Sequence, residues 1–447
     1  MAEKQLEATA GATIFASTGQ IGYGHPDRMS TEHFYHAARG SRVRLLDPAY
    51  YFNVATYSLD FDEKYIYAFC YSPEESWTTY RHDLSGGTYR QDDYVFTEEL
   101  YFRICLKRTD GGDFGAGEAD AVGEILSFTA ADTPYREKAC FTEEIRKTAA
   151  RIRTAAAGAK DALVFALLAD SHYTVNGTWE DTAHNLARVH EAAPFDAIVH
   201  LGDLTDGMLP RKITRDYVRQ TLDDLRENGI PLYVVPGNHD SNYYAGNPEP
   251  LSQSEQAALY LRQGDARVNR QEGRCYYFTD YASARLRCVF LFSFDPEQRP
   301  RYGFPDEELA WLRETLDATP AGYAVVVFSH VPPIPRLDFW SDAIRNGDAL
   351  LAILEEYDAR DGSRVLAYFH GHTHADFIYT ETAFPIISVA CAKCEYFTDK
   401  KPEGAAAPER RLGDRTQDAW DTLVLSPAEG KIELIRFGAG KDRRFSP

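Results

Sequence analysis

Short apolar runs recur through the last two-thirds of the chain, and polar residues follow each one. They occupy residues 162–168, 195–201, 232–235, 323–328 and 365–369. Runs of this length, rich in Val, Ile, Leu and aromatic residues, predict buried β-strands. Stretches with helical character alternate with them, so the pattern predicts an α/β domain.

The predicted helices include residues 182–192, 214–227 and 305–318. A further helix is expected before the first of the buried strands. Its apolar stripe repeats at helical spacing and consists of Ile145, Ala149, Ile152 and Ala156. Thr142 is the expected N-cap of this helix, and Gly158 is expected to end it.

The first part of the chain has a different pattern. Apolar and polar positions alternate in residues 65–71 and 102–107, which predicts strands between two environments. Glycine-rich turn signals at 85–87 and 110–112 divide short strands and favour a β-sandwich. We therefore predict an all-β accessory domain over 1–135 and an α/β domain over 136–447.

Two segments near the end of the chain, residues 421–425 and 431–437, predict a hairpin. Together with the alternating strands and helices, this hairpin predicts two packed mixed sheets with helices outside. The fold class expected for the whole chain is therefore α/β (α+β overall), preceded by a small all-β sandwich domain.

Residues able to bind a metal ion directly follow the predicted strands of the α/β domain. They are Asp170, His172, Asp203, Asn238, His330, His372 and His374. In open α/β sheets, ligands bind at the carboxyl ends of the strands. Imidazole, carboxylate and amide groups suit Mn, Fe or Zn. The sequence therefore predicts a metal site that needs no cysteine.

The fragments around these residues stand in the order and local settings of the calcineurin-like metallophosphoesterase family. They are Asp170-Ser171-His172, Gly202-Asp203, Gly237-Asn238-His239-Asp240, Ser329-His330 and Gly371-His372-Thr373-His374. The chain resembles this family over roughly residues 160–440. The segment 436–440 resembles the closing segment of its bacterial members. The resemblance implies a four-layer αββα sandwich and a phosphoric ester hydrolase, either a phosphodiesterase or a phosphomonoesterase.

The resemblance also implies a dinuclear metal centre with a role for each ligand. The first metal would take Asp170, His172 and His374. The second would take Asn238, His330 and His372. Asp203 would bridge the two, as in other two-metal sites. The expected cofactors are therefore two divalent or trivalent metal ions: Mn, Fe or Zn.

A family-like mechanism would use a metal-bridging hydroxide as the nucleophile. His239 follows a ligand in the chain but is not a ligand of the family. The resemblance makes it the general acid that protonates the leaving oxygen. Asp206 and Asp240 are candidates for orienting nearby histidines from behind the ligands.

The charge of the chain limits its partners. With 68 acidic residues and 48 Lys and Arg, the formal net charge is −20, which argues against binding to a nucleic-acid polymer or an anionic membrane. A phosphoester substrate is compatible with this charge because bound metals would supply local positive charge. The first residues lack the apolar region of a signal peptide, and no run approaches the ~18 apolar residues of a membrane helix.

The seven cysteines form no disulfide framework, so we expect a reducing compartment and a cytoplasmic protein. Cys391 and Cys394 form a CxxC motif. Without a second such motif, we expect a structural or incidental role for it instead of a redox or zinc role. The oligomeric state stays open.

Two other functions are compatible with the sequence. The chain could be a binding or structural protein with a vestigial metal site. A glycan-binding face with Trp77, Tyr80 and Tyr89, or a phage-tail-type module around 99–113, would then carry the function. The third reading is a protein phosphatase, which shares the core chemistry.

Substrate selection is expected from loops around the site. The candidate loops are 208–212, 241–246, 295–303 and 331–336. The sequence leaves open whether their arginines and tyrosines bind substrate or only pack.

Overall fold

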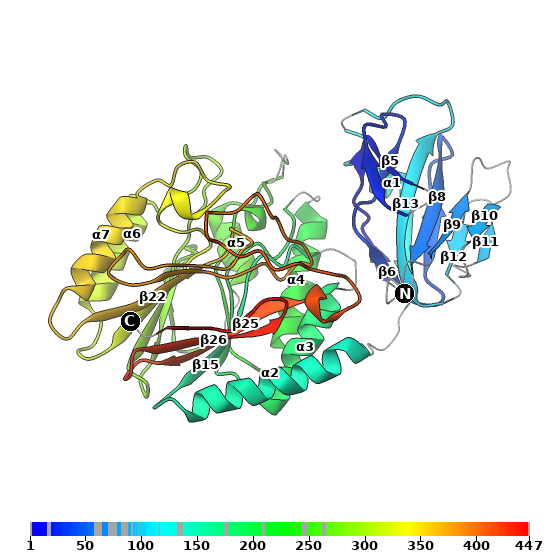
Figure 1. Cartoon of the computed structure of the whole chain (residues 1–447). Helices are drawn as coiled ribbons and strands as arrows, with labels where there is room; N and C mark the ends of the chain where they lie inside the picture. Colours follow the sequence, from blue (N-terminus) through cyan, green and yellow to red (C-terminus); the bar gives the residue numbers. More distant parts are fainter. Residues whose placement is uncertain are drawn as a thin grey trace. The chain divides into compact units, whose positions relative to one another are not determined.

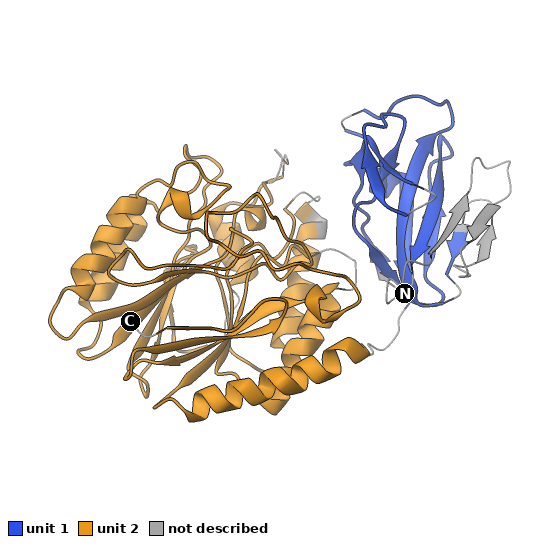
Figure 2. Cartoon of the chain, viewed as in Figure 1, with its two compact units in different colours: residues 1–136, 174–177 blue, residues 137–173, 178–447 orange. Residues whose placement is uncertain are grey.

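The computed structural model (Figure 1) divides the chain into two compact units, residues 1–136 with 174–177 and residues 137–173 with 178–447 (Figure 2). The structure describes residues 2–15, 19–57, 65–69, 78–81, 88–90, 93–96, 98–115, 117–131, 137–173, 178–207, 211–243, 247, 249–261 and 265–445. Each unit is considered by itself below.

The first unit is built almost entirely of strands. They are Ala2–Lys4 (β1), Thr9–Ala10 (β2), Ala12–Ile14 (β3), Ile21–Tyr23 (β4), Met29–Ser30 (β5), Tyr35–Ala37 (β6), Arg42–Leu45 (β7), Tyr50–Tyr57 (β8), Tyr65–Phe69 (β9), Thr78–Arg81 (β10), Thr88–Arg90 (β11), Asp93–Val95 (β12), Leu100–Arg108 (β13) and Leu126–Ala130 (β14). A short helix, Val122–Ile125 (α1), precedes β14.

These strands pair antiparallel in two main sheets, ordered β1-β14-β7-β12-β11 and β10-β9-β8-β13-β5-β2. Aromatic rings fill the space between the sheets. The ring of Phe102 on β13 lies 4.9 Å from that of Phe128 on β14 and 4.7 Å from that of Phe96. The unit is therefore an all-β sandwich, as the alternating pattern predicts.

The second unit alternates strands and helices. Its strands are Leu163–Leu168 (β15), Ala197–His200 (β16), Leu232–Val234 (β17), Val268–Arg270 (β18), Tyr277–Tyr281 (β19), Leu286–Phe290 (β20), Ala324–Phe328 (β21), Arg364–His370 (β22), Phe377–Tyr379 (β23), Ile386–Ser388 (β24), Ala419–Ser426 (β25), Lys431–Gly438 (β26) and Arg443–Phe445 (β27). Its helices are Ala139–Ala157 (α2), Thr178–Ala192 (α3), Arg211–Arg226 (α4), Gln253–Tyr260 (α5), Asp306–Asp317 (α6) and Gly347–Asp358 (α7), with short 3-10 turns at His239–Ser241 (η1), Pro335–Leu337 (η2) and Arg415–Gln417 (η3).

Two mixed sheets form the centre of this unit. Sheet 1 has the order β17-β16-β15-β25-β26-β27, and sheet 2 has the order β18-β19-β20-β21-β22-β24-β23. In sheet 1, β15, β16 and β17 are parallel, and β25 joins them antiparallel. In sheet 2, β20, β21, β22 and β24 are parallel. The parallel strands of each sheet therefore end at one edge.

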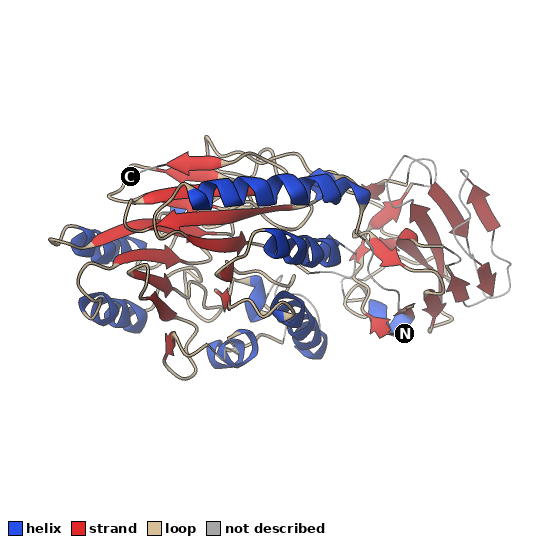
Figure 3. Ribbon diagram, turned by 90° about the horizontal axis from the view of Figure 1, so that it is seen from below, coloured by secondary structure: helices blue, strands red, loops and turns tan. Residues whose placement is uncertain are grey.

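The two sheets face each other across an aromatic core. The ring of Phe165 on β15 lies 5.2 Å from that of Tyr281 on β19, and Tyr233 on β17 lies 5.2 Å from Phe290 on β20. Helices cover the outer faces (Figure 3). On sheet 1, the ring of Phe141 of α2 lies 6.1 Å from that of Phe437 on β26. On sheet 2, α7 packs against β22. The unit is the four-layer αββα sandwich that the family resemblance implies.

The structure corrects the expected start of helix α2. The helix begins at Ala139, and its N-cap is Lys138, four residues before the predicted N-cap Thr142. The hydroxyl of Thr142 instead donates to Glu137 at 2.7 Å. Gly158 ends the helix as expected. Within the described ranges, no helix is both long enough and apolar enough to pass through a membrane.

Candidate metal centre

Five loops at the carboxyl edges of the two sheets meet at one place. Sheet 1 supplies the residues after β15, β16 and β17, and sheet 2 supplies those after β21 and β22. The seven predicted ligands all lie on these loops. The topology thus brings together residues separated by as many as 204 positions in the chain, from Asp170 to His374.

The loops that carry the ligands have an unusual backbone. Five of the predicted ligands have positive φ angles: Asp170 (53°), His172 (40°), Asp203 (56°), His372 (61°) and His374 (54°). A non-glycine residue in this region is uncommon and costs free energy. Contacts in the surrounding fold must offset this free energy. The backbone conformation directs five ligand side chains into one small volume.

Glycines beside the ligands make this convergence possible. A Cβ on Gly202 would lie 2.5 Å from Nδ1 of His330, and one on Gly371 would lie 2.9 Å from Oδ2 of Asp170. A Cβ on Gly237 would overlap the carboxylate of Asp203. Any other residue at these positions would displace a ligand, which explains the glycine directly before Asp203, Asn238 and His372.

Asp170, His172 and His374 form the first group of possible ligands, with one ligand atom of each within 4.8 Å of the others. Nε2 of His172 lies 3.3 Å from Nε2 of His374, which lies 3.5 Å from Oδ1 of Asp170. All three side chains are largely buried. This group corresponds to the predicted first metal site.

Two carboxylates fix which nitrogens of this group face each other. Nδ1 of His172 lies 3.2 Å from Oδ1 of Asp206, and Nδ1 of His374 lies 2.9 Å from Oε1 of Glu395. A carboxylate beside Nδ1 favours the neutral tautomer that keeps its proton on Nδ1, so that Nε2 is the atom that can bind a metal. The two Nε2 atoms face each other at 3.3 Å, where they can share either a proton or a metal ion. The donor set therefore fits a bound metal ion.

Asp203, His330 and His372 form the second group. Oδ2 of Asp203 lies 3.3 Å from Nε2 of His330 and 3.8 Å from Nε2 of His172. Asp203 therefore stands between the two groups, in the place of a bridging carboxylate. Nε2 of His330 also lies 3.0 Å from Oδ1 of Asn238, which brings the predicted amide ligand into the same group.

His372 differs from His172 and His374, because its Nε2 and not its Nδ1 lies next to a carboxylate. Its Nε2 lies 3.3 Å from Oδ2 of Asp338 and 3.3 Å from the hydroxyl of Ser341. Nδ1 is consequently the atom available as a ligand. Asp338 follows the turn η2, and no pattern in the sequence marks it as part of the site.

The electrostatics of the site favour positive charge. Burial alone would lower the pKa of His330, but Asp203 and Asp170 raise it to about 9. Burial would likewise lower the pKa of His374, but Asp170 holds it well above its usual range. Burial would raise the pKa of Asp203, but the histidines around it hold it well below its usual range. The buried carboxylates therefore attract positive charge, and protonated imidazoles or bound metal cations can supply it.

His239 lies at the first turn after the predicted ligand Asn238. Its Nδ1 donates to the carbonyl oxygen of Asp206 at 2.6 Å, and its Nε2 lies 3.8 Å from Oδ2 of Asp203. Its side chain is 16% exposed. Nε2 is thus the nitrogen that faces the site, and a molecule bound there can reach it.

The two acidic residues expected to orient histidines behave differently. Asp206 contacts two of them, His172 through its carboxylate and His239 through its carbonyl oxygen. The carboxylate of Asp240 instead accepts hydrogen bonds from the backbone N–H groups of Asp203, Leu204 and Gly237, at 2.7–2.9 Å. Asp240 therefore holds together the backbones of two ligand loops.

Lys393 connects two of the supporting carboxylates. Its Nζ lies 3.5 Å from Oδ1 of Asp206 and 3.4 Å from Oε2 of Glu395. Glu395 and Lys393 follow Cys391, which lies in a cluster with His374 and Glu395. The CxxC segment, for which the sequence predicts a structural or incidental role, therefore lies against the metal centre.

A neighbouring buried histidine, His200, makes the stability of this region depend on pH. Its Nδ1 accepts the N–H of Gly202 at 3.3 Å, so its Nε2 carries the proton and donates to Ser171 at 2.6 Å. Burial lowers its pKa to about 3, so the ring is neutral in the folded protein. In the unfolded chain it takes up a proton below about pH 6.5.

Stability should therefore fall as the pH drops below about 6.5, by about 1.4 kcal/mol per pH unit for this histidine. His200→Asn keeps an acceptor for Gly202 but removes the titrating group. We expect its free energy of unfolding, measured with urea in the presence of a chelator, to fall less steeply between pH 6.5 and 5. The same slope in both proteins would show that His200 is not responsible.

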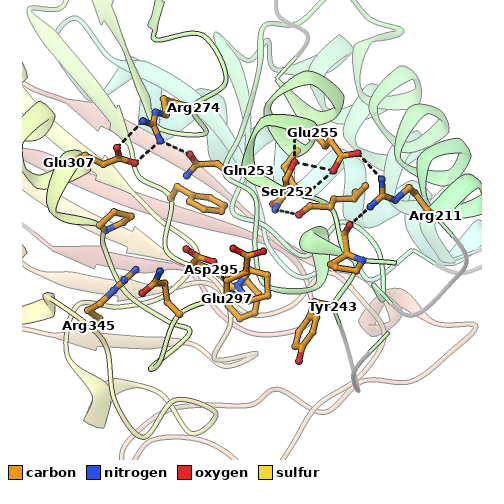
Figure 4. Close-up of a pocket in the computed structure, with 18 residues that line it drawn as sticks. Arg211, Tyr243, Ser252, Gln253, Glu255, Arg274, Asp295, Glu297, Glu307 and Arg345 are labelled. Atoms are coloured by element: carbon orange, nitrogen blue, oxygen red, sulfur yellow. Dashed lines mark hydrogen bonds and ion pairs between the residues drawn. The ribbon is translucent and has the colours of Figure 1, made fainter. Parts of the chain in front are cut away.

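The second unit also has a pocket of about 610 Å³, and Figure 4 shows the residues that line it. Tyr243, Phe292 and Phe294 line it, and two of its three arginines, Arg211 and Arg274, are paired with Glu255 and Glu307. The ring of Tyr302 separates this pocket from the metal centre, since it lies 5.2 Å from Phe294 and 4.9 Å from His372.

Some expected features fall outside the described residues. They are Trp77, the side chains of Tyr80 and Tyr89, and parts of the loops 208–212 and 241–246. In the loop 295–303, Arg301 donates to the hydroxyl of Tyr243 at 3.2 Å and lies over its ring. This pair packs two of the residues whose role the sequence leaves open.

Residues 163–376 match the sequence model of a family described as calcineurin-like phosphoesterase, and the match includes His239 and all seven predicted ligands. A dimetal phosphatase from Danio rerio is 16% identical, with a TM-score of 0.46, over 64% of this chain and 98% of that one. GAP50, the anchor in the inner membrane complex of Plasmodium, is 14% identical, with a TM-score of 0.39, over 63% of this chain and 90% of that one. A putative 5′-nucleotidase from Staphylococcus aureus is 13% identical, with a TM-score of 0.36, over 64% of this chain and 54% of that one.

Proposed function

Because residues 163–376 belong to the calcineurin-like phosphoesterase family, we propose that the protein hydrolyses a phosphoester with the help of two bound metal ions. Residues 136–447 would form the catalytic domain, and residues 1–135 an accessory domain. Asp170, His172 and His374 would hold one metal, Asn238, His330 and His372 the other, and Asp203 both.

One observation carries this proposal above the others. Nε2 of His172 and Nε2 of His374 approach to 3.3 Å, while each ring has its Nδ1 next to a carboxylate. Imidazole nitrogens that converge on one point, each with a carboxylate beside its other ring nitrogen, have the arrangement that is usual for histidines bound to a metal. It also argues against a vestigial site, because both the ligands and the carboxylates behind them are in place.

The chain's own residues then have distinct tasks. Bound metal ions would supply the positive charge that activates water and neutralises phosphate oxygens. Asp203 holds the two ligand groups at a fixed separation, and its Oδ1 accepts the backbone N–H of His239 at 2.8 Å. That hydrogen bond places the His239 ring beside the centre. Nε2 of His239 would then deliver a proton to the leaving oxygen.

Elemental analysis followed by a substrate panel tests the proposal. We expect two metal ions per chain and hydrolysis of phosphate mono- or diesters when Mn, Fe or Zn is supplied. The panel also decides between mono- and diesterase activity. A protein that binds no metal, or that binds two and hydrolyses no ester, would favour the binding or structural reading. Hydrolysis of phosphopeptides alone would favour a protein phosphatase.

Glu395 offers a test of the first metal site that does not rely on activity. Its carboxylate beside Nδ1 of His374 should make Nε2 a stronger ligand. Glu395→Gln keeps the shape of the side chain but removes its charge, so we expect metal affinity to fall about 10–100-fold. Competition with a chromogenic chelator measures this change.

Glu381→Gln is the matched control, because the side chain of Glu381 is 76% exposed and pairs with Arg336 on the surface. It should leave metal affinity unaltered. If Glu395→Gln binds metal as tightly as the unaltered protein does, Glu395 has no part in the metal centre.

A further inference from the structure

Exposed aromatic residues of the second unit gather at one border of the metal centre. Among the described residues of that unit, the most exposed large apolar side chains are Phe339 (47%), Trp340 (37%) and Tyr396 (36%). With the half-buried Phe397, they form what we call the aromatic rim. Exposed apolar groups that cluster in this way commonly mark a binding site.

The aromatic rim adjoins the first metal group. The ring of Phe397 lies 5.9 Å from that of His374, and the ring of Trp340 lies 6.5 Å from it. Trp340 and Phe397 also contact each other edge to face at 5.5 Å. Tyr396 and Phe397 directly follow Glu395, whose carboxylate is bound to His374. The rim is thus built on the residues that support this ligand.

The position of Trp340 is also fixed from the second metal group. Its backbone N–H donates to Oδ1 of Asp338 at 3.0 Å, and Oδ2 of the same carboxylate lies 3.3 Å from Nε2 of His372. One carboxylate therefore ties the loop bearing Phe339 and Trp340 to a predicted metal ligand. A ring held in this way loses little entropy when a ligand stacks on it.

The rim also carries a positive charge. Nζ of Lys400 lies 5.5 Å from the centroid of the Trp340 ring and 5.4 Å from that of Phe397. Flat π-systems stack on such aromatic faces, and a nearby ammonium group favours a ligand that is also anionic. A long aliphatic chain would gain apolar burial on the rings, but it would gain nothing from stacking or from the charge.

We propose that the aromatic rim binds the leaving-group side of the substrate, which is therefore a phosphoester whose alcohol carries a flat heterocyclic or aromatic ring, as in a nucleotide. The proposal rests on the phosphoester hydrolysis proposed above. It assigns Trp340 to specificity, because the metal centre recognises the phosphate and cannot recognise the ring.

Two substrates with the same leaving oxygen test it. Adenosine 5′-monophosphate and ribose 5-phosphate differ in the base alone, and their methyl diesters serve if the enzyme acts on diesters. We expect the base-bearing substrate to be preferred in kcat/KM. Trp340→Ala should reduce that preference about tenfold, in keeping with the usual contribution of one stacked base. Trp340→Phe should retain most of it.

Tyr23→Ala is the control, since Tyr23 is an exposed aromatic residue (64%) of the first unit. It should leave the preference as it is. If Trp340→Ala leaves the ratio of kcat/KM for the two substrates unchanged, the proposed role of the rim is wrong, even if both rates change. Equal rates for both substrates in the unaltered protein would overturn it as well.

Binding of adenosine separates the rim from the chemistry. Adenosine has the ring but no phosphate, so its binding, measured by saturation-transfer NMR, requires no hydrolysis. We expect binding to the unaltered protein and its loss in Trp340→Ala. If the protein supplied with metal hydrolyses no ester of the substrate panel but adenosine binding depends on Trp340, the proposed function fails and the rim stands. If adenosine does not bind, or binds equally to Trp340→Ala, the rim fails.

Discussion

Asp203→Asn is expected to abolish metal-stimulated hydrolysis, with kcat falling on the order of 10³-fold or more. Metal ions in such sites supply several kcal/mol of transition-state stabilisation, and about 1.4 kcal/mol corresponds to a tenfold change in rate. Oδ2 of Asp203 lies 3.3 Å from His330 and 3.8 Å from His172, one histidine from each ligand group. The asparagine amide would place an N–H₂ donor there, which cannot bind a metal. Metal content should fall from two ions per chain to at most one.

This substitution should disturb the fold less than most replacements of a buried charged residue do. Asp203 has a φ of 56°, a backbone conformation that asparagine adopts as readily as aspartate. The amide oxygen can also still accept the N–H of His239, which Oδ1 accepts at 2.8 Å. The fold of the loop should therefore survive. Activity is measured with a chromogenic phosphoester, and metal content by elemental analysis.

Asp161→Asn provides a matched control. Asp161 also has a positive φ, 49°, but its side chain is exposed, and β15 separates it from the ligand Asp170 at the other end of that strand. The same chemical change in the same backbone region should leave activity and metal content unaltered. Full metal-dependent activity in Asp203→Asn would contradict the assignment of Asp203 and the proposed function with it.

His239→Ala is expected to keep both metals and to lose about 10²–10⁴-fold in kcat, the usual contribution of a positioned general acid. The loss should be largest for poor leaving groups such as alkoxides and smallest for p-nitrophenolate, which departs without a proton. This dependence on the leaving group distinguishes an acid from a metal ligand. The matching control is His184→Ala, in which a half-buried histidine of α3 that pairs with Glu137 is removed.

Geometry alone does not decide whether His239 is a general acid or a metal ligand. Its ring also forms a group with His172 and Asp203 in which one possible ligand atom of each lies within 4.8 Å of the others. Burial lowers its pKa to about 4, although Asp203 opposes this effect. The ring is therefore neutral near pH 7 in the protein without substrate. To act as an acid it must be charged, and the negative phosphate of a bound substrate raises its pKa in that direction. Loss of both metals from His239→Ala would show that it is a ligand.

The strands of the second unit illustrate how far a local pattern reaches. The run at 323–328 predicts β21 almost to the residue, because consecutive valines with aromatic neighbours fit a strand covered on both faces. Helix α7 and strand β20 were not predicted. In the structure α7 packs against the predicted strand β22, and β20 pairs with the predicted strand β21. The start of α2 was misplaced because Thr142 binds the side chain of Glu137 instead of capping the helix.

The amino-acid sequence by itself determined the ligand types and their places after strands, since a strand's apolar run and the polar residue that follows it are local in the chain. It could not determine which nitrogen of each histidine faces the centre. That depends on Asp338 and Glu395, which pack behind His372 and His374 from distant loops. The exposed aromatic rim could not be predicted from the sequence either, because the exposure of a side chain depends on which parts of the fold cover it. Only the tertiary structure brings these groups to the ligands, and its contacts between distant segments are what no local pattern encodes.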